Sequence, residues 1–378
     1  MNRAVYYESL IKVPSSAPPH WAASCTHQEC SLHQLSPYIG KLKSIIAHDL
    51  ILQYSKPGEL VADMFCGSGT VPLEAARLER RVFASDTSIY AVTLTKGKLE
   101  APSDTETALK ALDHLLEHAK TLPVPDLRSV PKWVRAFFHP QTLKEVLRLS
   151  EFLNNEKHYF LLASLLGILH HQRPGFLSFP SSHLVPYLRS KKYPRANHPE
   201  LYEYRPVTER LQAKVKRALK RPPTQSLNKF VDDISMSSVE SVNLPDDIDC
   251  VITSPPYMNA LDYSRDNRLR LWFLGETHLE APDRVLASLD AFRRLISSLL
   301  KQLQQKMRLG GHCVFVIGEQ TFRGGGRFPS EELTRIFLSP PSTFQLCDVV
   351  SDIIPDVRRS RKHFAGVKQE NILVFRKF

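Results

Sequence analysis

The sequence predicts an α/β fold with a mostly parallel sheet and a long, largely helical insertion. Three observations support this prediction. An apolar run at 60–65 leads into the Gly-rich turn 66–70, with a helix and a second strand following within about 30 residues. A second apolar run, 249–253, leads into two consecutive prolines. Between these regions the chain has apolar residues at helical spacing.

The expected elements divide the chain into three zones. Residues 1–100 hold an N-terminal segment and the first α/β half, with strands at 60–65 and 81–85 and a helix at 71–78. Residues 101–225 form the insertion, with helices at 108–119, 141–153 and 159–170. Residues 226–378 return to α/β, with strands at 229–231, 249–253, 312–317 and 371–375 and a helix at 291–307.

Length and composition limit the class of protein. A chain of 378 residues suggests two domains or one enlarged domain. Its longest apolar run, 159–169, is shorter than the roughly 20 residues that cross a bilayer, and its first residues lack a signal-peptide core, so we expect no membrane association. Six cysteines make no disulfide framework, which favours a reducing compartment.

The net charge of +11 favours a polyanionic partner. Much of it is concentrated between residues 170 and 221, where 12 Lys and Arg face three Glu. Within that segment Arg189, Lys191, Lys192 and Arg195 alternate with tyrosines, as in surfaces that bind phosphates. A second basic run contains Arg358 and Arg359. Either run can equally be a solvated surface.

The Gly-rich turn is the first segment that suggests chemistry. A strand that ends in such a turn lets backbone approach a ligand closely, with helix N–H groups directed at it. Asp86 ends the next expected strand, where an acid can accept hydrogen bonds from both hydroxyls of a ribose. The alternatives are a purely structural turn and a capping aspartate.

The run Thr253-Ser254-Pro255-Pro256-Tyr257 is more specific. Two prolines stiffen the backbone and remove two N–H donors, which leaves carbonyl oxygens to accept hydrogen bonds from an amine. Tyr257 adds a flat face for a planar ring. A rigid turn with a core tyrosine is the structural alternative, but a position at the carboxyl end of a strand in the same sheet favours a binding site.

FCGSGT followed after a long gap by TSPPY resembles the S-adenosylmethionine-dependent amino-methyltransferases of DNA, which modify cytosine N4 or adenine N6. The resemblance implies a class I methyltransferase fold, which is Rossmann-like. The TSPPY form is more similar to the cytosine-N4 branch, because Asp usually replaces Ser in the adenine branch. The long insertion between the second and third strands departs from the family's usual arrangement, so recognition residues are argued here from charge alone.

The resemblance also implies roles for particular residues. The first motif would hold the methionine part of the cofactor, Asp86 its ribose, and Asp233, at the end of the third strand, would lie near the adenine. A looser match suggests that His33, Tyr38 and Lys41 border the cofactor. The residues expected to bind cofactor are therefore Asp63, Phe65, Cys66, Gly67, Gly69, Thr70, Asp86, Asp233, Tyr38 and Lys41, and the expected catalytic residues are Ser254, Pro255, Pro256 and Tyr257.

The implied reaction is direct methyl transfer to an exocyclic amine. Hydrogen bonds from the amine to the Ser254 side chain and the Pro255 carbonyl would direct its lone pair at the methyl group. Tyr257 would stack on a base flipped out of double-stranded DNA. Asn259, Asp262 and Arg265 would lie near the flipped nucleotide, and glycines 324–326 read as a mobile loop near the cleft.

We therefore expect a sequence-specific DNA methyltransferase acting on cytosine N4, in the bacterial cytoplasm, with a cognate restriction enzyme as a further partner. Adenine-N6 methylation, methylation of an RNA base and a catalytically silent nucleic-acid-binding protein are the alternatives. No resident metal is expected. Cys25, His27, Cys30 and His33 lie within nine residues but lack a common zinc-ligand spacing.

Overall fold

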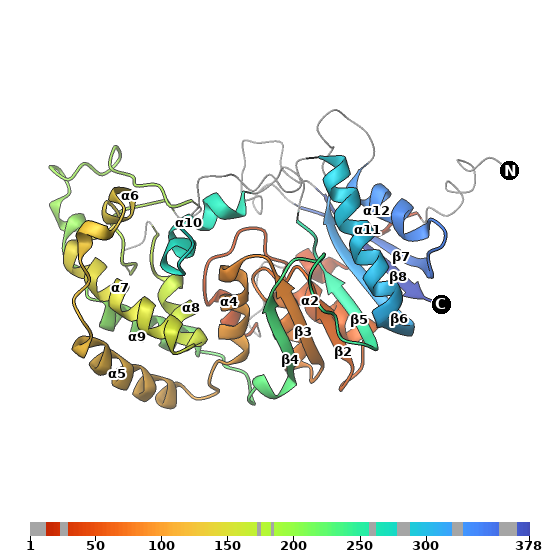
Figure 1. The fold of residues 1–378 in the computed structure, drawn as a ribbon, viewed down its shortest axis with the longest axis horizontal. Helices are drawn as coiled ribbons and strands as arrows, with labels where there is room; N and C mark the ends of the chain where they lie inside the picture. Colours follow the sequence, from red (N-terminus) through yellow and green to blue (C-terminus); the bar gives the residue numbers. More distant parts are fainter. Residues whose placement is uncertain are drawn as a thin grey trace.

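The computed structural model describes residues 13–22, 29–171, 175–182, 185–256, 262–277, 288–319, 328–354 and 369–378. An eight-stranded sheet in the order β1-β7-β8-β6-β5-β2-β3-β4 crosses the molecule (Figure 1). Its strands are β1 (Ser15–Ser16), β2 (Leu60–Asp63), β3 (Arg81–Asp86), β4 (Val231–Met236), β5 (Ile248–Thr253), β6 (Met307–Gly318), β7 (Phe344–Ile353) and β8 (Gln369–Lys377).

All neighbouring strands pair in parallel except those with β8, which is antiparallel to both β6 and β7. A mostly parallel sheet with this one antiparallel strand near its end is the class I methyltransferase fold, so the fold class predicted from the sequence is confirmed. The chain reverses its direction of travel across the sheet between β2 and β5. In open α/β sheets, ligands bind beyond the carboxyl ends of the strands at such a reversal.

Two layers of helices cover the sheet. One face packs against α2 (Ser44–Tyr54), α3 (Thr70–Arg77) and α4 (Ile89–Leu99), and the other against α11 (Leu289–Lys306) and α12 (Pro329–Leu338). Alternation along the strands divides the core between them. In β6, Val314 and Val316 belong to the first core, whereas Cys313, Phe315 and Ile317 belong to the second.

The insertion forms a helical layer beyond α4 (Figure 1). It contains α5 (Thr105–Thr121), α6 (Lys132–Arg135), α7 (Pro140–Asn155), α8 (Tyr159–Gly167) and α9 (Val207–Ala218). A Cβ on Gly97 of α4 would lie 2.6 Å from the Tyr159 carbonyl oxygen, so the glycine lets α8 pack closely. The insertion therefore shares one apolar core with the sheet, and α10 (Tyr263–Phe273) contacts both parts.

Three strand predictions are corrected by the structure. β2 ends at Asp63, two residues early, and β4 begins at Val231, where the expected strand ended, because 228–230 form a 3-10 turn. β6 begins at Met307 and passes through the expected glycine turn, where a register shift against β5 and the positive φ of Gly310, 79°, accommodate extra residues. The strand β7 was not predicted. None of the helices in the described residues is long and apolar enough to span a bilayer.

Candidate functional site

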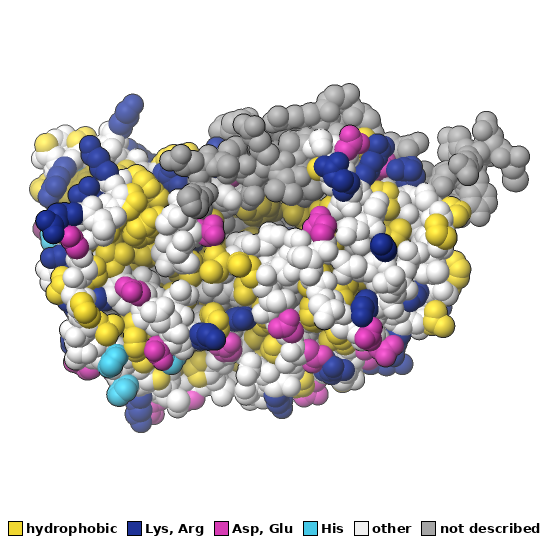
Figure 2. Space-filling model, viewed as in Figure 1, with side chains coloured by type: hydrophobic (Ala, Val, Ile, Leu, Met, Phe, Trp, Pro, Cys, Tyr) yellow, Lys and Arg dark blue, Asp and Glu magenta, His cyan; other side chains and the backbone are white. Residues whose placement is uncertain are grey.

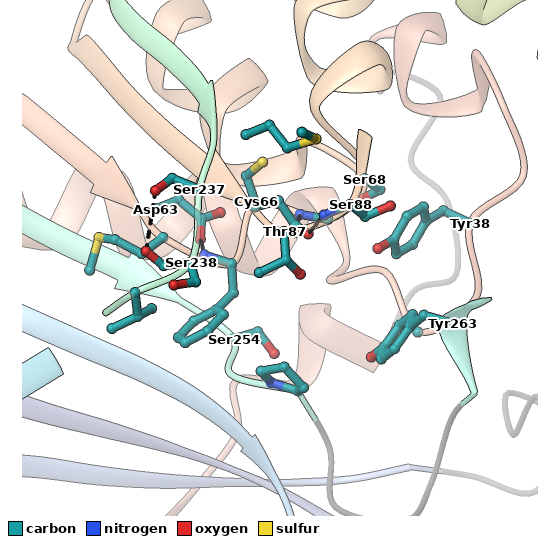
Figure 3. Close-up of a pocket in the computed structure, with 18 of the residues that line it drawn as sticks. Tyr38, Asp63, Cys66, Ser68, Thr87, Ser88, Ser237, Ser238, Ser254 and Tyr263 are labelled. Atoms are coloured by element: carbon teal, nitrogen blue, oxygen red, sulfur yellow. Dashed lines mark hydrogen bonds between the residues drawn. The ribbon is translucent and has the colours of Figure 1, made fainter. Parts of the chain in front are cut away.

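A cavity of about 520 Å³ lies at the carboxyl ends of β2, β3, β4 and β5, where the fold places ligands (Figure 3). The residues that line it come from both halves of the α/β domain and from α10. They include Tyr38, Lys41, Asp63, Phe65, Cys66, Gly67, Ser68, Thr70, Asp86, Met236, Ser237, Ser238, Ser254, Pro256, Tyr263, Ser264 and Glu276.

The two glycines of the turn have different roles. Gly67 has a φ of 47° and lines the cavity, and a Cβ there would lie 3.4 Å from the Tyr38 ring. Gly69, with a φ of 69°, caps α3 and is not among the lining residues. A Cβ on Gly69 would lie 2.6 Å from Thr95 Oγ1 and 2.9 Å from its Cα. Gly67 therefore shapes the cavity, whereas Gly69 allows α3 and α4 to pack.

Asp86 is fixed at the end of β3 by backbone donors. The Gly67 amide donates to Asp86 Oδ2 at 2.9 Å, and the Ser88 amide donates to Oδ1 at the same distance. The Gly-rich turn thus holds the carboxylate at the cavity wall without a side-chain cation in these two bonds. The structure brings together the turn and the acid that the sequence analysis paired.

Asp63 joins the two sequence motifs. Its carboxyl oxygen Oδ1 accepts hydrogen bonds from the Thr253 hydroxyl at 2.6 Å and from the Phe65 amide at 3.2 Å. Burial raises the pKa of Asp63 to about 7, although both hydrogen bonds act in the opposite direction. Since Thr253 directly precedes Ser254, this bond holds the carboxyl ends of β2 and β5 together.

The Ser254 hydroxyl lies at the cavity and donates to the Val316 carbonyl oxygen of β6 at 3.0 Å. A hydroxyl has one proton, so with that proton used the oxygen serves its surroundings as an acceptor. Pro255 is buried and Pro256 lines the cavity, and neither has an amide N–H. This end of the cavity therefore offers acceptors rather than donors.

Tyr38 and Tyr263 form a tyrosine wall on the side of the cavity away from Asp63 (Figure 3), and the buried Tyr90 packs behind Tyr38. The Tyr38 ring stacks on Tyr90 with centroids 5.9 Å apart, and lies 6.1 Å from the Tyr263 ring. The buried Tyr90 hydroxyl donates to the Pro37 carbonyl at 2.7 Å, next to Tyr38 in the chain. Tyr38 was predicted at this site, whereas Tyr90 and Tyr263 were not, because tyrosines on helices resemble ordinary core residues.

The predicted position of Asp233 at the end of the third strand is wrong. β4 continues to Met236, so Asp233 lies within the strand, pairs with Phe83 and is exposed away from the cavity. The residues that reach the cavity lie at and just after the true end of the strand, and they include Met236, Ser237 and Ser238. A better strand boundary would have identified them.

A buried charge network positions the segment before α2. Glu74 of α3 accepts hydrogen bonds from His33 at 2.6 Å and from His48 at 3.1 Å, and it pairs with Arg77 at 2.6 Å. Burial alone raises the pKa of Glu74, but these hydrogen bonds hold it well below its ordinary value. His33 therefore serves this network and not the cavity, while Lys41 lines the cavity and donates to the His33 carbonyl.

Four of the six predicted DNA-binding residues, Arg189, Lys191, Lys192 and Arg195, lie in the segment 185–205 of the insertion, called the basic segment below. Lys191, Lys192 and Arg195 are exposed, and Figure 2 shows Lys and Arg side chains gathered over this end of the molecule. Arg189 and Lys192 lie over the Tyr193 ring at 5.5 and 5.6 Å. The Tyr193 ring therefore restricts both cations, and neither of them is among the residues that line the cavity.

Several predicted residues lie outside the described part of the chain: Tyr257, Asn259, Arg358, Arg359, the 324–326 glycines, Cys25 and His27. Asp262 and Arg265 are described, and both lie at the first turn of α10, where Asp262 caps the helix. Cys30 is buried, with its thiol directed at the Arg221 carbonyl. Among the described residues, no group of three or more His, Cys, Asp or Glu is placed to hold a metal.

Comparison with known proteins supports the first motif. Residues 25–97 match the model of a family described as DNA methylase. These residues include the Gly-rich turn, Asp86 and the Glu74 network, but not the 253–257 run. No curated protein matches the chain.

Solved structures resemble the chain only distantly. TrmN from Thermus thermophilus is 12% identical with a TM-score of 0.37, and the alignment covers 92% of this chain and 52% of TrmN. The chain thus spans about half the length of TrmN. The rRNA methyltransferase aviRa from Streptomyces viridochromogenes is 12% identical, with a TM-score of 0.38 and coverage of 95% and 96%. Geranyl diphosphate C-methyltransferase from Streptomyces coelicolor A3(2) is 8% identical with a TM-score of 0.38, and the alignment covers 100% of this chain and 94% of that enzyme.

Proposed function

We propose that this chain transfers a methyl group from S-adenosylmethionine to the exocyclic N4 of cytosine in DNA. The main support for this proposal is that residues of both sequence motifs line one cavity. Asp86 and the Gly-rich turn lie at one side of it, and Ser254 and Pro256 lie at another. The match of residues 25–97 to a DNA methylase family supports the same reading.

The lining residues fit the cofactor. Gly67 leaves a space that a Cβ would narrow, beside a carboxylate that two backbone amides already orient. A carboxylate accepts several hydrogen bonds, so Asp86 would receive the ribose hydroxyls. Met236 would pack against the adenine, with Ser237 and Ser238 next to its polar edge. The volume of about 520 Å³ suits a ligand of this size.

When bound, S-adenosylmethionine supplies a methyl group on a positively charged sulfur. The chain's own contribution is to orient the amine that accepts it. Because Ser254 donates its proton to Val316, its oxygen would accept an N–H from the target amine. The Pro255 carbonyl would accept the second N–H. These bonds would direct the nitrogen lone pair at the methyl group, and the amine would lose a proton to solvent after transfer.

The basic segment of the insertion would hold the DNA backbone. Its exposed cations, Lys191, Lys192 and Arg195, would contact phosphates, which gives affinity without sequence information. Tyrosine rings beneath some of the cations reduce the freedom lost on binding. Base recognition is therefore expected from residues closer to the cavity.

Adenine N6 in DNA is the second candidate for the target atom, because its amine presents the same two N–H groups to Ser254 and Pro255. The serine form of the second motif favours cytosine. An RNA base is the third candidate, since the basic segment would bind RNA phosphates by the same charges.

The test is methyl transfer from labelled S-adenosylmethionine to unmethylated genomic DNA and, separately, to total RNA. Digestion to nucleosides and mass spectrometry then identify the product. We expect N4-methylcytosine from DNA. N6-methyladenine would keep the mechanism but replace the target base, and label in RNA alone would overturn the choice of substrate. Cofactor binding without label in either nucleic acid would contradict the proposed activity.

A further inference from the structure

A buried arginine stands behind the tyrosine wall of the cavity. Arg270 of α10 is 2% exposed, and its guanidinium lies over the Tyr90 ring at 5.6 Å. Its Nε donates to the Leu166 carbonyl of α8 at 3.2 Å, and Nη1 reaches Asn267 at 3.4 Å. Arg270 thus connects α8 and α4 to the helix that follows the catalytic run in the chain.

A buried cation such as Arg270 is ordinarily paired with a carboxylate. Among the described residues it forms no ion pair, and its Nη2 atom has no hydrogen-bond partner. The neighbouring His170 is also fully buried, and within the described part of the chain its Nε2 atom has no hydrogen-bond partner. A buried arginine held this way adds little to stability, because an apolar side chain of similar size avoids the cost of removing the charge from water.

The contacts of Arg270 connect it, through Tyr90, to the cavity residue Tyr38. Its guanidinium covers Tyr90, whose other contacts hold the chain just before Tyr38: the Tyr90 hydroxyl bonds Ser36 and Pro37. Tyr90 also stacks on Tyr38, which lines the cavity. The first turn of α10 supplies Tyr263, which lies against the same Tyr38 ring. The start of α10 therefore contacts Tyr38 directly through Tyr263, and Arg270, near its end, acts on Tyr38 through Tyr90.

We propose that Arg270 is a positioning residue, which fixes Tyr90 and α10 so that Tyr38 and Tyr263 form the cofactor-binding wall. The proposal deepens the proposed function and rests on it. It predicts that loss of the guanidinium lowers cofactor affinity while leaving the folded state intact. A merely structural arginine would instead affect stability and binding together.

The test compares Arg270→Met with Arg205→Met. Arg205 is a matched control: it is 8% exposed and bonded to the Phe176, Ser178 and Leu201 carbonyls, but it is not among the residues that contact the tyrosine wall. The measurements are the dissociation constant for S-adenosylhomocysteine by calorimetry and the melting temperature without ligand. Tyr90→Phe, which removes only the two hydrogen bonds with Pro37 and Ser36, serves as a second probe of the same wall.

We expect Arg270→Met to weaken S-adenosylhomocysteine binding at least tenfold, with a melting temperature equal to or above that of the wild type. Tyr90→Phe should weaken binding severalfold, and Arg205→Met should change it less than twofold. Wild-type affinity in Arg270→Met would overturn the proposal, as would an equal loss in Arg205→Met. If Arg270→Met does not fold, wild-type affinity in Tyr90→Phe overturns it. Failure of the wild type to bind the ligand contradicts the proposed function itself.

Discussion

The Thr253 hydroxyl donates a 2.6 Å hydrogen bond to Asp63 Oδ1, across 190 residues of sequence. This bond joins the residue that ends β2 to the residue that precedes Ser254. It places the Gly-rich turn and the Ser-Pro-Pro run at fixed positions on one edge of the sheet. The pairing of the two sequence motifs therefore has a direct physical link in the folded chain.

Asp63 makes stability depend on pH in an unusual direction. Its pKa in the folded state is about 7 and its unperturbed value is 3.8, so the folded state binds the proton more tightly. The contribution of that proton to stability, roughly 4 kcal/mol, is complete below pH 3.8 and is lost as the pH rises to about 7. Urea unfolding of wild type and Asp63→Asn checks this. The stability of wild type minus that of the variant should fall between pH 4 and 7. A stability difference that does not change between pH 4 and 7 would contradict the raised pKa of Asp63.

Thr253→Val tests the link between the motifs. The valine keeps the shape of the side chain but removes the donor, so the pKa of Asp63 should rise further. The pH region over which stability falls should then extend above that of the wild type. Cofactor binding should weaken at pH 8, where Asp63 must hold a charge with one bond fewer. An unchanged pH profile would show that Thr253 does not control the carboxyl.

Glu74 has the opposite pH behaviour. Its folded-state pKa lies below the ordinary value of 4.5. The contribution of the ionised carboxylate to the free energy of unfolding is therefore present above about pH 4.5 and is lost as the pH falls through the folded-state pKa. Glu74→Gln leaves His33 and Arg77 without a charged partner and should destabilise the fold by about 3 kcal/mol at pH 7. Urea unfolding at pH 7 and pH 4 measures this. Glu117→Gln, which breaks an exposed pair with Lys120, should change little.

Three glycine-to-alanine variants separate backbone strain from steric overlap. Gly58 has a φ of 82° and open space around it. The free energy of unfolding of its alanine variant should therefore fall only by the cost of a left-handed alanine, about 1–2 kcal/mol. Gly67→Ala should lose a similar amount and also bind cofactor more weakly. Gly69→Ala should be the least stable, because its Cβ would meet the Thr95 backbone. Thermal unfolding with and without S-adenosylhomocysteine distinguishes them, and equal stability of all three would refute the assignment.

The basic segment should contribute affinity without specificity. Replacing Lys191, Lys192 and Arg195 by glutamine should weaken binding to any DNA duplex. The slope of log affinity against log salt should become shallower by about 0.9 for each phosphate that the variant no longer neutralises. Lys120→Gln, on the exposed side of α5, is the control. Binding by fluorescence anisotropy at several salt concentrations measures the slope, and an unchanged slope would place the DNA elsewhere.

Much of the fold and part of the site could be predicted from the sequence. Strand–turn–helix order and apolar periodicity located the ends of β2, α3, β3 and β5 within two residues. Asp233 was misplaced because the Asp232-Asp233 pair reads as the end of a strand, whereas pairing with β3 extends β4 to Met236. Ser237 and Ser238 have no signature of their own, since serines after a strand are common in loops.

The buried charges were harder to foresee. Glu74 and Arg270 lie on helices, where a charged residue is ordinarily solvated, and only the packed structure shows that each is buried. Their partners, His33 and Tyr90, are distant in sequence. Tertiary contacts of this kind leave no local pattern, so they appear only once the helices and the segment before α2 are placed together.

The most direct test of the central claim is turnover by Ser254→Ala, with cofactor affinity measured in the same preparation. The serine oxygen is assigned to the target amine and not to the cofactor. We therefore expect S-adenosylhomocysteine to bind within twofold of the wild type, while kcat for methyl transfer falls about ten- to a hundredfold, as expected for the removal of a hydrogen bond of roughly 1–3 kcal/mol. Wild-type kcat, or loss of cofactor binding in parallel, would contradict the assignment of this cavity.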